Sequence, residues 1–168
     1  MAAALVALRV LEPDYDITEA GAVLGNVKVP GRMECLGDHP QVFADVGHNP
    51  HAARWLADKI NRLKKNRAGQ VYAVYAALAD KNVEGIAGVM SAVVDGWYLA
   101  GLSVPRGLTG EALRQRITGE LPSSRTALVF DTVSGAVAAA LEQAEPEDLV
   151  IIFGSFFTVG EARAFLQS

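Results

Sequence analysis

The stretch VFADVGHNPHA, residues 42–52, has the pattern of a strand, a tight turn and the start of a helix. Its first half is apolar apart from one carboxylate, which is typical of a strand buried on both faces. Asn49 can cap a helix, and Pro50 suits the first helical position because proline lacks the N–H that would have no partner there. Asp45 and His48 should therefore lie at the carboxyl end of a strand, where open α/β sheets bind their ligands.

Beyond this stretch, short apolar segments alternate with segments whose apolar residues recur at helical spacing. We predict further strands and four more helices after the one that begins at Pro50: one whose Val83, Ile86 and Met90 share a face, two that follow Thr109 and Thr132, and a final helix that opens on a Thr158-x-x-Glu161 capping box. The predicted strands cover residues 33–36, 42–46, 71–75, 97–100, 128–130 and 149–153.

This alternation predicts an α/β fold of the Rossmann-like, doubly wound type, with a mainly parallel sheet and helices on both faces. Turn-forming residues at positions 37–40 separate the first two strands, so those strands can form a hairpin and place an antiparallel strand at the edge. We assign residues 31–168 to this domain. Residues 1–30 contain a short helical piece and a second capped helix over 18–24, which are too short for a core of their own, and we interpret them as a tail or linker from a preceding domain.

Composition excludes several classes of protein. The chain has 168 residues, of which 51% are hydrophobic and 20% charged, and a net charge of -4 without a basic stripe. We therefore expect no nucleic-acid partner. No segment approaches the roughly 18 to 20 apolar residues of a membrane span, and the apolar start lacks the basic region of a signal peptide. Cys35 is the single cysteine, which points to a reducing, cytoplasmic setting.

The spacing Asp45-x-x-His48-x-x-His51 raises the question of a metal site. His51 would lie inside the helix and need not point where His48 points, and such sites usually need three or four convergent ligands, so we expect no metal here. A carboxylate at the end of a buried strand is costly unless it is paired. Asp45 should therefore either bind nearby loop N–H groups or reach a ligand.

Phosphate-binding motifs are missing from the sequence. Neither G-x-x-x-x-G-K-[ST] nor G-x-G-x-x-G after a strand occurs, so the phosphates of any nucleotide bound here must be held largely by something else. Polar groups do follow the predicted strands, at Asp80-Lys81-Asn82, Arg106 and Ser155. Each alone is typical of a cap or a surface group, but together they should border one crevice.

Five short motifs carry a resemblance to a known family. PGRME (30–34), DVGHNP (45–50), ADKN (79–82), PRG (105–107) and FGSFFTV (153–159) occur in the order and spacing of the C-terminal domain of folylpolyglutamate synthase/dihydrofolate synthase. That enzyme belongs to the Mur ligase superfamily, and the resemblance extends over essentially the whole chain. It implies an ATP-dependent ligase that phosphorylates a carboxylate of dihydropteroate or a folate and lets the amine of L-glutamate displace the phosphate.

The resemblance also implies roles for individual residues. Arg32 matches an arginine that reaches the ATP phosphates, and Asp45 a carboxylate that accepts from the ribose hydroxyls. His48 matches a histidine beside the nucleotide and the reacting centre. Lys81 matches a lysine that meets a carboxylate of the incoming amino acid, and Ser155 a serine at the glutamate site.

In the family, the P-loop, the magnesium ligands and most of the folate site belong to an N-terminal domain. The resemblance therefore implies that this chain is a fragment, that ATP and Mg²⁺ are the cofactors, and that the chain alone is inactive. We expect it to act as a monomer together with that P-loop domain. Two alternatives stay open at this point: a free-standing Rossmann-like nucleotide-binding module without ligase activity, and a metal hydrolase that uses Asp45, His48 and His51.

Overall fold

The computed structural model describes residues 2–14, 29–65 and 68–168. The chain divides into two compact units, residues 1–30 and 31–168, which we describe separately. The first unit contains helix α1 (Ala2–Leu11), which confirms the short helical piece predicted there. The helix predicted over residues 18–24 lies outside the described residues. The assignment of the first unit to a preceding domain stays a prediction.

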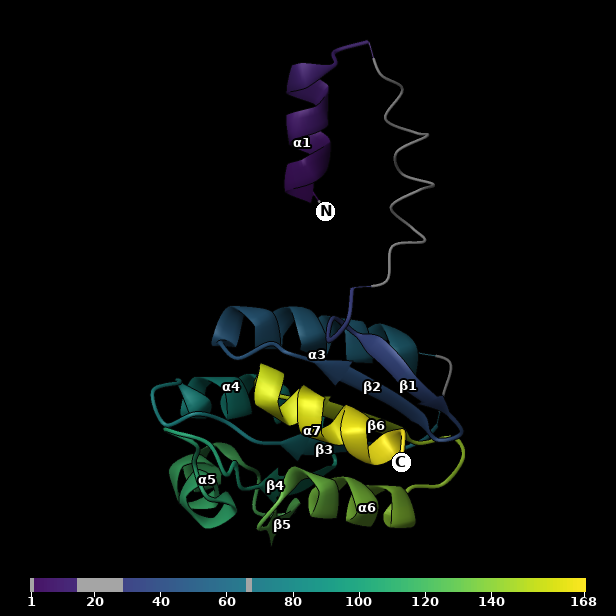
Figure 1. The fold of residues 1–168 in the computed structure, drawn as a ribbon. Helices are drawn as coiled ribbons and strands as arrows, with labels where there is room; N and C mark the ends of the chain where they lie inside the picture. Colours follow the sequence, from purple (N-terminus) through teal and green to yellow (C-terminus); the bar gives the residue numbers. More distant parts are fainter. Residues whose placement is uncertain (1, 15–28, 66–67) are drawn as a thin grey trace. The chain divides into compact units, whose positions relative to one another are not determined.

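The second unit is built on a single six-stranded sheet (Figure 1). Its order is β1-β2-β6-β3-β4-β5; β1 runs antiparallel to β2, and every other pair is parallel. This confirms the mainly parallel sheet and its antiparallel edge strand. The strands are β1 (Glu34–Asp38), β2 (Gln41–Asp45), β3 (Val71–Tyr75), β4 (Gly96–Ala100), β5 (Thr126–Phe130) and β6 (Leu149–Phe153).

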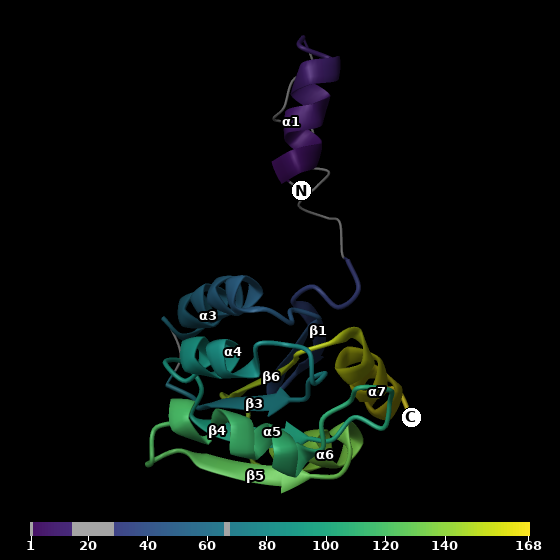
Figure 2. The ribbon, with the colours of Figure 1, turned by 90° about the vertical axis from the view of Figure 1, so that its left-hand side faces the viewer.

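Helices cover both faces of the sheet (Figure 2). On one face, α3 (Pro50–Lys64), α4 (Val83–Met90) and α5 (Gly110–Ile117) share a buried apolar cluster, and a short 3-10 helix (Thr118–Glu120) follows α5. On the other face, α6 (Val133–Gln143) and α7 (Phe156–Leu166) share a second cluster. The chain is therefore doubly wound, as predicted.

Helix starts follow the predicted caps with one exception. Asn49, Thr109 and Thr132 each accept a hydrogen bond from the backbone N–H three residues later. The predicted Thr158–Glu161 capping box is wrong, because α7 begins at Phe156 and is capped by Ser155. The physical reason is the turn directly after β6: Gly154 has φ 121°, a conformation that favours glycine, and it brings Ser155 to the cap position three residues earlier.

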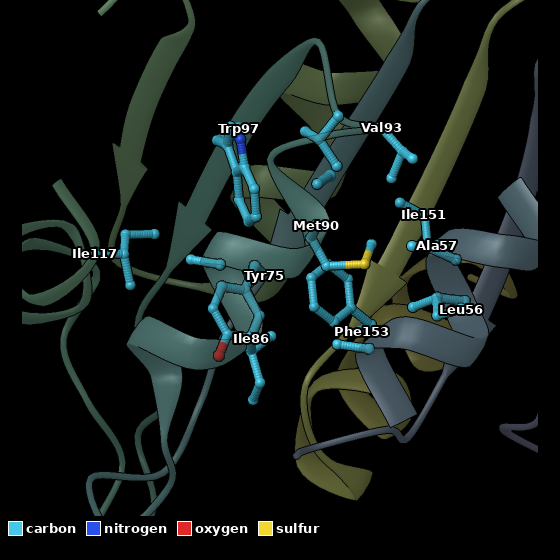
Figure 3. Close-up of a cluster of buried hydrophobic side chains, with 14 of the residues drawn as sticks. Leu56, Ala57, Tyr75, Ile86, Met90, Val93, Trp97, Ile117, Ile151 and Phe153 are labelled. Carbon is cyan, nitrogen blue, oxygen red and sulfur yellow. The ribbon is translucent and has the colours of Figure 1, made fainter. Parts of the chain in front are cut away.

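Stacked aromatic rings fill the core where β3 and β6 end (Figure 3). Tyr75 and Phe153 are paired across the two strands, and their ring centroids lie 4.6 Å apart with nearly parallel planes. Trp97 packs edge-on against both rings, and all three side chains are buried. Burial raises the pKa of the Tyr75 hydroxyl well above its ordinary value. This packing makes a rigid floor beneath the loops that follow β3 and β6.

Candidate functional site

The sheet has its topological switch point around β6, which lies between β2 and β3. The chain leaves β2 and β3 toward the face covered by α3 and α4, whereas it leaves β6 toward the opposite face, covered by α7. The loops therefore diverge at the carboxyl ends of adjacent strands. In open α/β sheets such a divergence opens the crevice where ligands bind.

A cavity of about 140 Å³ occupies this point. It brings together three of the residues predicted from sequence, His48, Lys81 and Ser155, each from the loop after a different strand. A larger hollow of 360 Å³ at the amino ends of β3 and β4 contains none of the predicted site residues. The cavity at the switch point is lined by His48, Leu78, Lys81, Ser155, Phe156 and Phe157.

The imidazole of His48 is oriented by its own loop. Nδ1 lies 2.9 Å from the carbonyl oxygen of Val46, and because a carbonyl only accepts, Nδ1 must carry the hydrogen. Nε2 is then a hydrogen-bond acceptor when the ring is neutral. His51 is exposed on α3, and among the residues that the structure describes no three metal-ligating side chains converge. Asp45, His48 and His51 therefore do not form a three-ligand site in this structure.

Lys81 belongs to a small group of charged side chains. Its Nζ lies 2.8 Å from Oδ2 of Asp80, and Nη1 of Arg106 lies 3.5 Å from the same oxygen. The hydrogen bond from Lys81 is the main reason why the pKa of Asp80 is lowered below its ordinary value. Two cations and one carboxylate leave this side of the cavity with a net positive charge.

Ser155 is 5% exposed, and its hydroxyl belongs to a buried chain of hydrogen bonds. The Thr158 hydroxyl donates its one hydrogen to the carbonyl of Ala76 at 3.1 Å. The 2.7 Å contact between the two hydroxyls must then use the hydrogen of Ser155. Ser155 Oγ also accepts from the backbone N–H of Thr158 at 3.0 Å. Its remaining capacity toward a ligand is that of an acceptor.

Asp45 anchors the loop that carries Arg32. The carboxylate is 2% exposed, and its two oxygens accept from the backbone N–H groups of Met33 at 3.0 Å and Gly47 at 2.7 Å. The Val46 N–H donates to the carbonyl of Gly31 at 2.8 Å and closes the same loop. Of the two roles left open by the sequence, the structure shows loop anchoring. Arg32 is exposed above this anchor and does not line the cavity.

Three helices begin at the cavity. His48 and Lys81 directly precede Asn49 and Asn82, the caps of α3 and α4, and Ser155 itself caps α7. Each helix N-terminus carries a partial positive charge and free backbone N–H groups, so together they favour an anionic ligand. The cavity therefore combines an apolar wall with a cation and nearby helix N-termini that attract anions.

Sequence reasoning missed part of this lining. Phe156 and Phe157 are 66% and 51% exposed, which is unusual for phenylalanine, and they form an apolar wall beside the polar groups. Their position directly after a Gly-Ser turn is a signal that the sequence does contain. The sequence analysis places Thr158 in a capping box, whereas its hydroxyl donates a hydrogen bond to the carbonyl of Ala76. Ala76 lies 82 positions away in the sequence, so no local sequence pattern indicates this contact.

The sequence of this chain matches a known protein family and several of its members. Residues 31–156 match the family described as Mur ligase, glutamate ligase domain. The chain is 40% identical over 169 residues to dihydrofolate synthase/folylpolyglutamate synthase of Escherichia coli. This alignment covers 99% of the present chain and 37% of the E. coli protein. The chain is 35% identical to the Haemophilus influenzae protein of the same name, over 76% of this chain and 29% of the relative. The chain thus spans about a third of the length of these relatives.

Solved structures agree with the sequence matches. E. coli FolC in complex with DHPP and ADP has a TM-score of 0.85 at 35% identity, covering 98% of this chain and 37% of that one. A bifunctional folylpolyglutamate synthase/dihydrofolate synthase with Mn, AMPPNP and L-glutamate bound has a TM-score of 0.72 at 38% identity, covering 85% of this chain and 33% of that one. With the fold, the switch-point cavity and these matches in agreement, the chain belongs to the family of Mur ligase glutamate ligase domains.

Proposed function

We propose that this chain is the C-terminal, ATP- and glutamate-contacting domain of an ATP-dependent ligase that joins L-glutamate to dihydropteroate or a folate through an acyl phosphate. The observation that carries the proposal is the convergence of His48, Lys81 and Ser155 on one cavity at the switch point. Relatives that share 35% to 40% identity bear the name of this ligase, and one solved relative holds L-glutamate.

On the glutamate side, the ammonium of Lys81 and the helix N-termini attract a carboxylate of the incoming amino acid. Ser155 Oγ has its hydrogen engaged with Thr158, so it can accept a hydrogen bond from the glutamate amine but has none to donate to a carboxylate. Nε2 of neutral His48 is a second acceptor on the same cavity. This arrangement orients the amine of glutamate toward the reacting carbonyl and its carboxylate toward Lys81.

On the nucleotide side, Arg32 reaches the ATP phosphates with its exposed guanidinium, and His48 lies between the nucleotide and the glutamate site. Asp45 accepts from the ribose hydroxyls with the lone pairs that the two loop N–H groups leave, and it fixes the loop that presents Arg32. The permanent charge and forked donors of arginine suit a phosphoryl group whose charge changes during transfer.

The described residues contain no carboxylate cluster that fits Mg²⁺. We propose that the magnesium ligands, the P-loop and most of the folate site belong to an N-terminal domain of the same enzyme, from which Mg²⁺ would neutralise phosphate charge. We expect that enzyme to be a cytoplasmic monomer. No helix in the described part of this chain is both long and apolar enough to cross a membrane.

Arg32→Ala in the complete ligase tests the nucleotide side. We expect a raised KM for MgATP and a kcat lowered by about tenfold or more, because the lost contact is stronger when charge develops on the transferring phosphoryl. The control is Arg54→Ala, which removes an exposed arginine of α3 outside the cavity and should leave both constants unchanged. Steady-state kinetics with varied MgATP give the answer, and equal effects of the two changes would contradict the assignment of Arg32.

A further inference from the structure

Arg116, in the last turn of α5, binds the loop that carries Lys81 rather than its own helix. Nε and Nη2 donate to the two carboxylate oxygens of Glu84, at 2.7 Å and 3.0 Å. Nη1 donates to the carbonyl of Ala79 at 2.9 Å, and Nη2 also reaches the carbonyl of Lys81 at 3.1 Å. One guanidinium therefore contacts the chain before, at and after Lys81.

The backbone of Lys81 is held from several directions. Its N–H donates to the carbonyl of Leu78 at 3.2 Å, and its carbonyl accepts from the Val83 N–H at 3.0 Å in addition to Arg116. The preceding Ala79 is fixed on its N–H side by the carbonyl of Arg106, at 2.8 Å, and on its carbonyl side by Arg116. The side chain of Arg116 and the backbone carbonyl of Arg106, in the loop after β4, therefore both hold the loop that carries Lys81.

Neighbouring Arg114 makes the same kind of ion pair but does not hold the loop that carries Lys81. Its Nε and Nη2 donate to both oxygens of Glu111 at 2.8 Å and 2.7 Å, within α5 itself. Arg116 differs because its partners lie 32 to 37 positions away: Ala79 and Lys81 on the loop after β3, and Glu84 in the first turn of α4. Only a guanidinium has enough donors in one plane to serve a carboxylate and two carbonyls together. Its hydrogen bonds are the main reason why the pKa of Glu84 is lowered below its ordinary value.

We propose that Arg116 is a positioning residue for glutamate addition: it holds the backbone of Lys81 so that the ammonium meets the carboxylate of the incoming amino acid. This inference rests on the proposed role of Lys81 at the glutamate site. Since a carboxylate contact is made in both the ground state and the transition state, loss of Arg116 changes KM for L-glutamate more than kcat.

The test uses the complete ligase, with KM and kcat measured for L-glutamate and MgATP and with thermal midpoints for each variant. Arg116→Ala is expected to raise KM for L-glutamate about tenfold while KM for MgATP stays within about twofold. Arg114→Ala, the matched control, should change neither constant. Arg116→Lys keeps a cation beside Glu84 but cannot serve both carbonyls, so it should recover the thermal midpoint and leave KM for L-glutamate raised.

A double-mutant cycle separates this inference from the proposed function. In a Lys81→Met background, Arg116→Ala should add less than about twofold to KM for L-glutamate, because the group that it positions is gone. If Lys81→Met raises KM and Arg116→Ala does not, or if Arg116→Lys restores KM completely, the positioning role is overturned and the glutamate site stands. If Lys81→Met leaves KM unchanged, the glutamate site is overturned and the role of Arg116 falls with it.

Discussion

Replacement of Lys81 by methionine in the complete ligase is expected to raise KM for L-glutamate by roughly 10- to 100-fold, which corresponds to the loss of one charge-assisted hydrogen bond. Methionine keeps the length and apolar stem of the side chain, so the change removes mainly the charge. Lys81 lines the cavity, and together with Asp80 and Arg106 it gives a net charge of +1 beside the proposed position of the substrate carboxylate. KM for MgATP should change little, because Arg32, the residue that we propose for the phosphates, lies on a different loop.

The control for this prediction is Lys65→Met, which removes an exposed lysine at the opposite end of α3. Both variants lose one positive charge, so a general effect of net charge would appear in both. Initial rates with varied L-glutamate at saturating MgATP and folate substrate measure the effect. A KM for L-glutamate that is the same in the two variants would remove Lys81 from the glutamate site.

Asp45→Ala is expected to destabilise the domain by about 2 to 4 kcal/mol, because it leaves the buried N–H of Gly47 and the half-buried N–H of Met33 without a partner. Each buried donor without an acceptor costs about 1 to 3 kcal/mol. Urea denaturation of this chain, followed by tryptophan fluorescence, measures the difference. In the complete ligase, the same change should also raise KM for MgATP, since the Arg32 loop loses its anchor.

The control for Asp45 is Asp58→Ala, which removes an exposed carboxylate from α3 and should alter stability by no more than about 0.5 kcal/mol. Asp45→Asn is informative as well, because its amide keeps one oxygen acceptor but turns an N–H₂ toward the second donor. The free energy of unfolding of Asp45→Asn should lie between those of the wild type and Asp45→Ala. A stability loss for Asp45→Ala as small as that of Asp58→Ala would show that the loop is held by other contacts.

The sequence predicted the parts of the fold that depend on local pattern. Buried strands such as 149–153 are continuous apolar runs, and caps such as Asn49 and Thr132 act within three residues, so both could be identified without a structure. The convergence of His48, Lys81 and Ser155 was also predictable, because the carboxyl ends of parallel strands meet at one edge. The wrong capping box at Thr158 arose because Gly154 shifts the helix start in a way that composition alone does not indicate.

The remaining features of the site depend on contacts between distant parts of the chain. Arg116 reaches the Lys81 loop from another helix, and a sequence pattern gives an arginine in a last helical turn no such partner. The direction of the Ser155 hydrogen follows from the bond between Thr158 and Ala76, which exists only in the folded sheet. The sequence predicts that burial of the Asp45 carboxylate is unfavourable unless it is paired. Only the structure identifies its hydrogen-bond donors, the N–H groups of Met33 and Gly47.

We propose that this domain carries one half of a ligase site, with contacts to glutamate and the nucleotide but without either Gly-rich phosphate-binding motif. The most direct test incubates the purified chain with MgATP, dihydropteroate and L-glutamate, with and without the P-loop domain added in trans, and measures ADP and the glutamylated product. The chain alone should unfold cooperatively on heating and form no product, since it lacks both Gly-rich phosphate motifs. Product formed only after complementation is the predicted result; robust turnover by the chain alone would contradict the account.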